Sequence, residues 1–191
     1  MGKNLSDMTR NELGCLFPII LSEPKIEWAN LFLQEKNYII SLLSREVAIR
    51  VEHIGSTAVP GLLAKPTIDM LVEIPENKDI DKRIISILTS NEYNYMHDNT
   101  DHLMFVKGYT EDGFKGQCYH IHMGPKDDNS LWDRIYFRDY LRLNPSVANE
   151  YATLKQELAV KYKNDREAYS EAKTDFIKNA TKLAKNHLKS K

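Results

Sequence analysis

The chain has 191 residues, enough to bury one sizeable core, and its 26 basic and 27 acidic side chains leave a formal net charge of -1. This balance argues against a protein that binds nucleic acid through bulk positive charge. No apolar run approaches the roughly 20 residues that a membrane-spanning helix needs, so we expect neither a nucleic-acid partner nor a membrane.

The two cysteines, Cys15 and Cys118, follow no spacing typical of metal ligands or of a redox motif. The chain also shows no secretory signal, and we therefore expect free thiols in a cytoplasmic protein. No internal repeat or low-complexity linker divides the sequence. It predicts a single domain over residues 1–191, made of an N-terminal arm (1–23), a sheet core (24–125) and C-terminal helices (126–191).

Near the start Ser6 or Thr9 can cap a short helix, but Gly14 and Pro18 interrupt any continuous helical pattern, which favours an irregular arm. The elements expected next, in chain order, are a helix over residues 26–43, strands over 47–52 and 67–74, and a helix over 78–88. A polar segment over residues 90–101 then precedes two further strands, over 102–109 and 117–123.

After Pro125 a helical period returns and continues towards the C-terminus. Asn144 and Pro145 break this region, and Pro145 suits the first turn of a new helix. Asp165 is the expected N-cap of a last helix. The whole pattern predicts an α+β protein, with a mixed sheet followed by helices.

The turn after the first strand contains Gly55 and Ser56, which offer an unobstructed backbone and one hydroxyl group to a phosphate. Lys65 can neutralise a phosphate charge, and Asp69, near the middle of the next strand, can hold a divalent cation. Together these residues predict a pocket for an anion and a metal. The alternative is that the Gly-Ser pair is only a tight turn.

His120 and His122 stand two apart on a predicted strand, so their rings project from one face about 7 Å apart. With Asp69 they would form a site of two histidines and one carboxylate, which suits zinc, manganese or iron. The alternative is that each histidine forms a hydrogen bond with a neighbour inside the sheet.

Arg134, Arg138 and Arg142 follow one another at four-residue steps on the helix after Pro125. They form one basic stripe, which can contact phosphates or can be a solvated face paired with acidic neighbours.

The chain from about residue 24 onwards resembles the GrpB family, a group within the nucleotidyltransferase superfamily. The matching segments are residues 53–61, 64–66, 68–69, 120–122 and 137–141, and Tyr169 with Lys173.

This resemblance implies a nucleotidyltransferase-like fold, a small mixed sheet flanked by helices. In that fold the turn at Gly55, Ser56 and Thr57 faces the phosphates of a nucleotide, and acidic residues on the next strand bind magnesium. The matched segment 137–141 also favours Arg138 as a ligand contact, held by a bidentate pair with Asp139.

Active members of the superfamily usually carry two acidic residues one position apart on that strand, so that both share the metal ions. In this chain the second position is Leu71. Glu73 faces the same side but lies roughly 13 Å from Asp69. Either further ligands come from elsewhere, or the protein binds a nucleotide-like molecule without transferring it.

Three functions therefore remain open. The first is a nucleotidyltransferase with Lys65 and Asp69 as catalytic residues, a nucleoside triphosphate as ligand, and magnesium or manganese as cofactor, with zinc as an alternative. The second is a non-catalytic module that binds a nucleotide or phosphorylated metabolite. The third is a metal-dependent hydrolase built on Asp69, His120 and His122.

Overall fold

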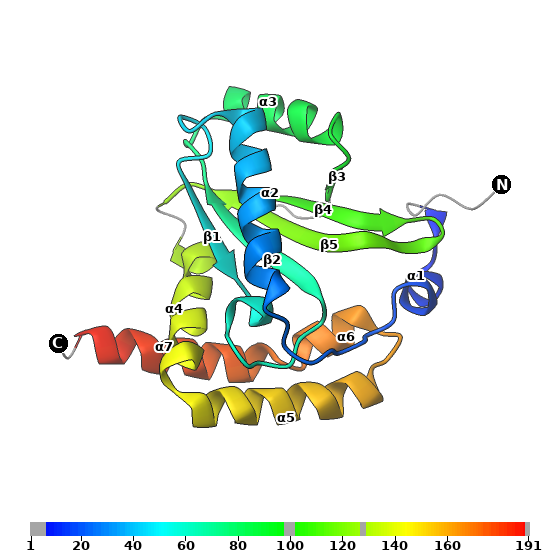
Figure 1. The fold of residues 1–191 in the computed structure, drawn as a ribbon, viewed down its shortest axis with the longest axis vertical. Coiled ribbons are helices and arrows are strands. Elements are labelled where there is room, and N and C mark those ends of the chain that lie inside the picture. The colour runs from blue at the N-terminus through cyan, green and yellow to red at the C-terminus, as the bar shows by residue number, and fades with distance from the viewer. Residues whose placement is uncertain (1–6, 98–101, 127–128, 190–191) are drawn as a thin grey trace.

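A mixed β-sheet lies at the centre of the molecule (Figure 1). The computed structural model describes residues 7–97, 102–126 and 129–189. Within these ranges the sheet has five strands in the order β1-β2-β5-β4-β3. They are β1 (Arg50–Ile54), β2 (Thr67–Glu73), β3 (Asn94–Tyr95), β4 (Leu103–Thr110) and β5 (Gly113–Gly124). The central pair, β2 and β5, is parallel, and the other pairs are antiparallel.

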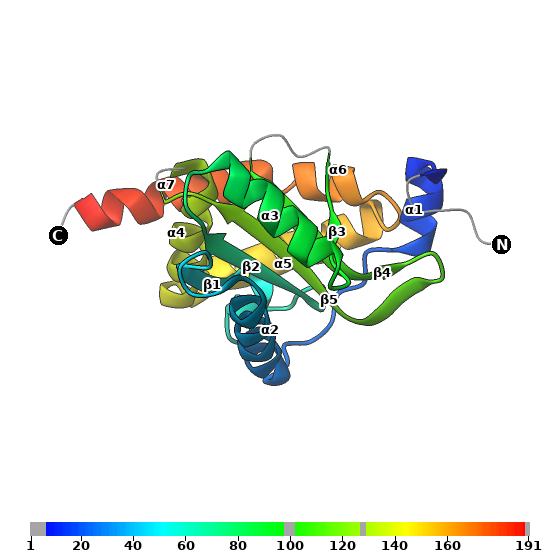
Figure 2. The same cartoon turned by 90° about the horizontal axis from the view of Figure 1, so that it is seen from above.

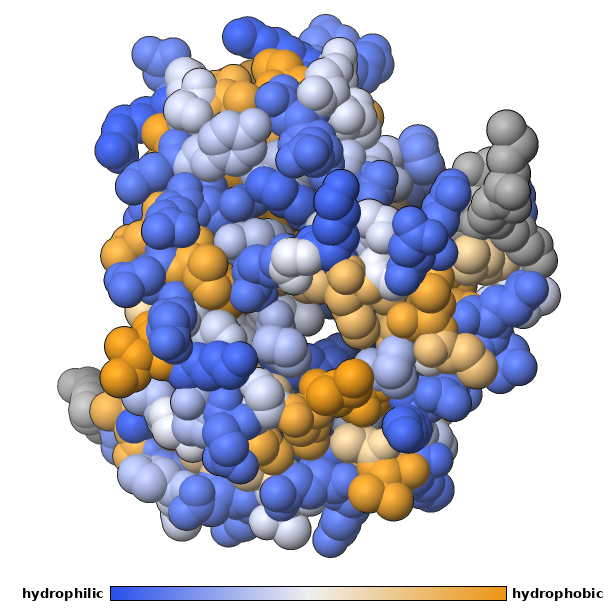
Figure 3. All heavy atoms as spheres, turned by 45° about the vertical axis from the view of Figure 1, so that its right-hand side comes forward, coloured by the Kyte–Doolittle hydropathy of each residue, from blue (hydrophilic) through white to orange (hydrophobic). Residues whose placement is uncertain are grey.

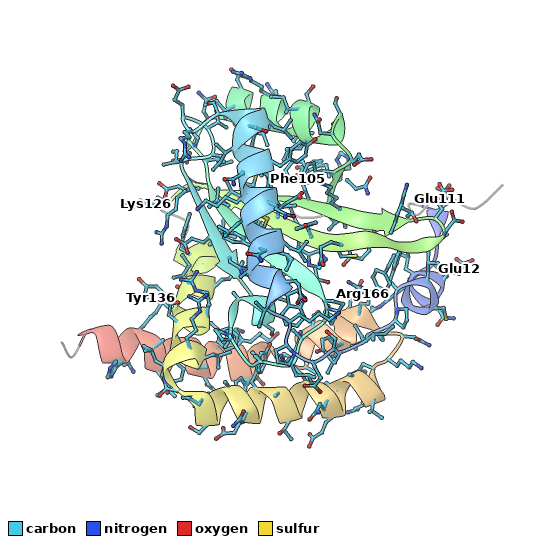
Figure 4. The ribbon with its side chains drawn as sticks, in the orientation of Figure 1. Glu12, Phe105, Glu111, Lys126, Tyr136 and Arg166 are labelled. Carbon is cyan, nitrogen blue, oxygen red and sulfur yellow. The ribbon has the colours of Figure 1, made fainter. Side chains whose placement is uncertain are left out.

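Two helices, α2 (Glu27–Leu43) and α3 (Lys78–Thr89), cover one face of the sheet (Figures 1 and 2). The alternate residues of β2 that point to this side, Ile68, Met70 and Val72, are fully buried there. Phe105 of β4, labelled in Figure 4, lies in the same core. This is the larger apolar core of the protein, and it takes no part in the site described below.

The C-terminal helices make a second layer on the opposite side. They are α4 (Asn129–Leu143), α5 (Pro145–Lys161), α6 (Arg166–Glu171) and α7 (Thr174–Lys189). Leu131 and Trp132 of α4 pack against Ile54 of β1 and Leu71 of β2. Because Asp69 shares this face with Leu71, the helical layer covers the aspartate as well.

The α+β architecture with a mixed sheet flanked by helices is confirmed, as are the helices over residues 26–43 and 78–88 and the break at Pro145. Asp165 caps a helix as expected, because its side chain accepts a hydrogen bond from the amide of Ala168. The last helical region, however, is divided into α6 and α7.

The prediction of an irregular N-terminal arm is wrong for part of its length, and its residues 1–6 lie outside the described ranges. Residues 10–16 form helix α1 (Arg10–Leu16), which starts with a capping box between Thr9 and Glu12. Gly14 lies within this helix, and the position requires a glycine because an added Cβ atom would overlap the carbonyl oxygen of Asn164.

The first strand begins later than expected, at Arg50, because the amide of Ala48 still bonds back to the carbonyl of Ser44 after α2. The short strand β3 falls in the polar segment over residues 90–101, of which residues 98–101 are not described. Both cysteines are free thiols, as predicted.

None of the helices in the described ranges combines the length and apolar composition of a membrane-spanning helix. The face drawn in Figure 3 is mostly hydrophilic, with smaller apolar areas between the charged groups.

Candidate functional site

The pairing of β1 with β2 brings the Gly-Ser turn to the acidic strand. In this antiparallel ladder Ile54 lies opposite Asp69, so the residues after Ile54 leave the sheet directly beside the carboxylate. Gly55 has a φ of 72°, and a Cβ atom at this position would lie 2.3 Å from Asp69 Oδ2. A glycine is therefore required both by the backbone conformation and by the space that the aspartate occupies.

The turn continues as a short 3-10 helix, η2 (Ser56–Ala58), which two arginines of α4 hold in place. Arg142 donates two hydrogen bonds to the carbonyl oxygen of Ala58, at 3.0 and 2.7 Å. Arg138 donates to the carbonyl oxygen of His53 at 2.9 Å and to the Glu52 carboxylate at 2.7 Å. The arginine stripe thus binds protein groups around the turn.

Arg138 does not contact the cavity, contrary to the expectation that it binds a ligand. It is only 7 % exposed, and the predicted bidentate pair with Asp139 is present, at 2.7 and 3.1 Å. Because its guanidinium group lies between Asp139, Glu52 and the end of β1, Arg138 positions the turn.

The side chains of His53 and Thr57 form buried hydrogen bonds that link the turn to β1 and β2. The hydroxyl of Thr57 donates to the carbonyl of Thr67 at 3.1 Å, so the His53 Nε2, at 3.1 Å from the same hydroxyl, acts as the donor. The ring of His53 stacks on Phe32, and burial lowers the pKa of His53 to about 4, although the charge of Asp69 opposes this shift. His53 is therefore neutral near pH 7, and the Thr57 hydroxyl has a structural role.

A cavity of about 910 Å³ opens between this turn, the sheet and the C-terminal helices. The residues that it shares with the predicted site are Gly55, Ser56, Thr57, Lys65, Asp69, His120 and His122, together with Tyr169 and Lys173. Such a volume suits a ligand of the size of a nucleotide.

Asp69 is held in a chain of hydrogen bonds that runs across the sheet. Its Oδ1 lies 3.1 Å from Nδ1 of His120, and the Nε2 of His120 lies 2.8 Å from the hydroxyl of Tyr109. Arg166, labelled in Figure 4, reaches from α6 and donates to the same hydroxyl at 3.3 Å. Because an ionised carboxylate only accepts, the Nδ1 of His120 is the donor to Asp69.

The carboxylate of Asp69 is ionised. Burial by itself would raise its pKa, but the hydrogen bond from His120 and the positive charges of His120, Lys65 and Arg134 lower the pKa overall. The side chain keeps 29 % of its surface exposed, because it faces the cavity. Asp69 is thus a fixed, negatively charged group at the cavity wall.

The expected metal site of Asp69, His120 and His122 is not assembled. In the parallel register Asp69 lies opposite His120, whereas His122 lies opposite Leu71. The Nδ1 of His122 is 2.8 Å from Nε2 of His102, and burial, together with the charge of Arg134, lowers its pKa well below the usual value. In the described ranges no group of three His, Cys, Asp or Glu side chains is placed to hold a metal ion, so the hydrolase hypothesis is not carried further.

The residues around Asp69 also do not fit a magnesium site with two carboxylates. Leu71, at the second acidic position, is fully buried among Ile54, Leu131 and Trp132. Magnesium at phosphate sites is bound through one or two carboxylates together with phosphate oxygens and water, and here one oxygen of Asp69 is already bonded to His120. β2 therefore lacks the second carboxylate, two residues after Asp69, that would share the metal ions.

Lys155 is a site residue that sequence reasoning missed. It is 2 % exposed, and its Nζ contacts the hydroxyl of Ser56 at 3.1 Å and the carbonyl of Leu63. A signal was available, because Lys155 lies one helical turn after Tyr151 and one before Leu158, on the apolar stripe of α5. A lysine in that stripe is either paired or functional.

Lys65 and Lys173 lie over the ring of Tyr169, with their Nζ atoms 5.5 and 4.1 Å from its centre. Burial lowers the pKa of Lys65 and of Lys155 to about 7, and the pKa of Lys173 to about 8. Neighbouring positive charges, from Arg166 and Lys173 at Lys65 and from Lys173 and Lys65 at Lys155, lower these values further. The cavity wall therefore carries three amines of lowered pKa, whose charged forms a neighbouring anion would stabilise.

The sequence over residues 18–183 matches the GrpB protein family. The chain belongs to the GrpB family. It is 32% identical to the glutamate-rich protein GrpB of Alkalihalophilus pseudofirmus, a similarity that covers 83% of this chain and 91% of that protein. A crystal structure of GrpB from Enterococcus faecalis superposes with a TM-score of 0.74 at 32% identity, over 86% of this chain and 96% of that one. The predicted family is confirmed.

Other relatives are longer than this chain. YqkA of Bacillus subtilis is 33% identical over 167 residues, which are 87% of this chain but 47% of YqkA, and the chain spans 61% of protein PA4798 of Pseudomonas aeruginosa. A crystal structure of the Cid1 poly(U) polymerase superposes with a TM-score of only 0.48 at 10% identity, over 70% of this chain and 45% of that one. That similarity is too low to inform on activity.

Replacing Gly55 by alanine tests the contact between the turn and the aspartate. Gly55→Ala should lower the free energy of unfolding by about 3 kcal/mol, because the positive φ costs about 1 kcal/mol and the new Cβ displaces Asp69 from His120. Gly61→Ala is the matched control, since Gly61 has a φ of 76° but no atom within 4 Å of an added Cβ. Equal losses for the two variants in urea denaturation would contradict the close contact.

Proposed function

We propose that this GrpB chain binds a phosphorylated small molecule, with a nucleoside triphosphate as the best-fitting class, in the cavity between the sheet and the C-terminal helices. One observation carries the proposal. Lys65, Lys155 and Lys173 line the cavity beside Ser56, and none of the ion pairs among the described side chains involves them. Lys155 is buried, and Lys65 and Lys173 are half-buried. Positive charges removed from water without such partners are costly, and a phosphate group would compensate them.

The rest of the lining supports the same class of ligand. Phe137, Tyr151, Tyr169 and Ile177 supply apolar and aromatic surface, on which the organic part of a nucleotide can pack. Ser56 supplies a hydroxyl group at the point where the lysines gather. A site with one charged end and one apolar wall is typical of pockets for phosphorylated metabolites.

Transfer of a nucleotidyl group is a second candidate function, and the hydrogen-bonded chain from Tyr109 through His120 to Asp69 favours it. This chain fixes an ionised carboxylate beside the proposed phosphate site, where it can accept a proton from an acceptor hydroxyl group. Pyrophosphate release from a bound triphosphate would distinguish transfer from binding alone.

Calorimetric titration with ATP, GTP, CTP, UTP and inorganic tripolyphosphate tests the proposal. The wild-type protein should bind at least one of these anions, whereas adenosine should not bind detectably. Lys155→Met should weaken binding at least about tenfold, because it removes one charge-assisted contact worth about 1.5 kcal/mol. Lys161→Met, the same change at an exposed position of α5, is the control. No binding of any phosphorylated probe, or equal effects of both variants, would contradict the proposal.

Affinity for the anion should also rise as the pH falls. The pKa of Lys65 and Lys155 is about 7 and that of Lys173 about 8 in the free protein, and a bound phosphate raises all three values by stabilising the charged amines. Binding therefore takes up protons and should weaken about tenfold or more between pH 7 and 9. Affinities measured across this range test the sign, and a flat profile, or one that strengthens at high pH, would contradict the role of the lysines.

A further inference from the structure

The carboxylates around the cavity are few for a site that handles phosphates. Among the described lining residues they are Asp69 and Asp133. Asp133 is paired with Lys185 at 2.5 Å, and Asp69 already accepts from His120 at 3.1 Å. The two carboxylates therefore each have a protein partner, and neither belongs to a set of ligands for a divalent cation.

Positive groups, in contrast, are numerous. The described lining includes Lys65, Lys155, Lys173, Lys178, Lys182, Lys185 and Arg134. The first three gather at the inner end, where Lys155 contacts Ser56 and the other two lie over the ring of Tyr169. Their ammonium groups lie over the rings of Tyr151 and Tyr169, which attract the positive charges without neutralising them.

In sites with two carboxylates, a divalent cation neutralises the phosphates and the carboxylates hold the cation. Here the protein supplies the positive charge itself, from three side chains that line the cavity. A lysine ammonium group binds phosphate oxygens as a compact charge with three donors. A divalent cation next to three ammonium groups would meet electrostatic repulsion.

We propose that this cavity takes its phosphorylated ligand without a divalent cation, with Lys65, Lys155 and Lys173 in the charge-neutralising role that magnesium has in sites with two carboxylates. The inference rests on the proposed function and adds the chemical form of the ligand. The free polyphosphate anion binds, and its magnesium complex does not have to form first.

Titration with inorganic tripolyphosphate in excess EDTA and in excess magnesium tests the inference. Affinity in EDTA should equal or exceed the affinity with magnesium, because magnesium competes with the lysines for the phosphate oxygens. Lys65→Met and Lys173→Met should each weaken binding in EDTA about tenfold, and magnesium should not restore it. Lys161→Met is again the control, and urea unfolding of each variant reports whether it is folded.

The outcomes separate the two proposals. Binding that requires magnesium, or that magnesium strengthens tenfold or more, would overturn this inference and leave the proposed function in place. Absence of binding under both conditions would overturn the proposed function and this inference with it.

Discussion

The close contact between Gly55 and Asp69 is the constraint on which the rest of the site depends. It follows from one register, in which Ile54 of β1 lies opposite Asp69 of β2, and from a residue without a side chain directly after it. Shifting the register by one residue would turn Asp69 towards the apolar core on the other face. The arginines of α4 then hold the turn in place through the carbonyl groups of His53 and Ala58.

The parallel pairing of β2 with β5 decides what Asp69 can do. It places His120 beside the carboxylate and His122 beside Leu71, so one histidine orients the aspartate and the other pairs with His102. The result is a single fixed negative charge facing lysines whose positive charges repel one another. Removal from water is the main cause of the lowered pKa values of Lys65, Lys155 and Lys173, and neighbouring positive charges lower these values further. We propose that a polyanionic ligand compensates these charges.

Local features of the site could be predicted from the sequence, because they depend on neighbouring residues. Gly55, Ser56, Lys65 and Asp69 lie within one strand-turn-strand segment, and alternation along the strand set the face of Asp69. Lys155 was missed because it lies 99 positions after Ser56 in the sequence. Only the packing of α5 brings the two side chains together. The prediction that Arg138 points into the pocket was wrong for a related reason. The spacing of the arginines indicated the helix face, but it could not show that Arg138 binds Glu52 of β1.

The central claim is that the inner end of the cavity is an anion site formed by the Gly-Ser turn and the lysines. Crystals soaked with tungstate test it most directly, because the anomalous signal of the metal locates a phosphate-like anion without assuming a base or an acceptor. We predict a tungsten peak placed so that the tungstate oxygens lie within hydrogen-bond distance of the Ser56 hydroxyl and of the ammonium groups of Lys65 and Lys155. Tungstate bound only at exposed lysines outside the cavity, with this end empty, would contradict the claim.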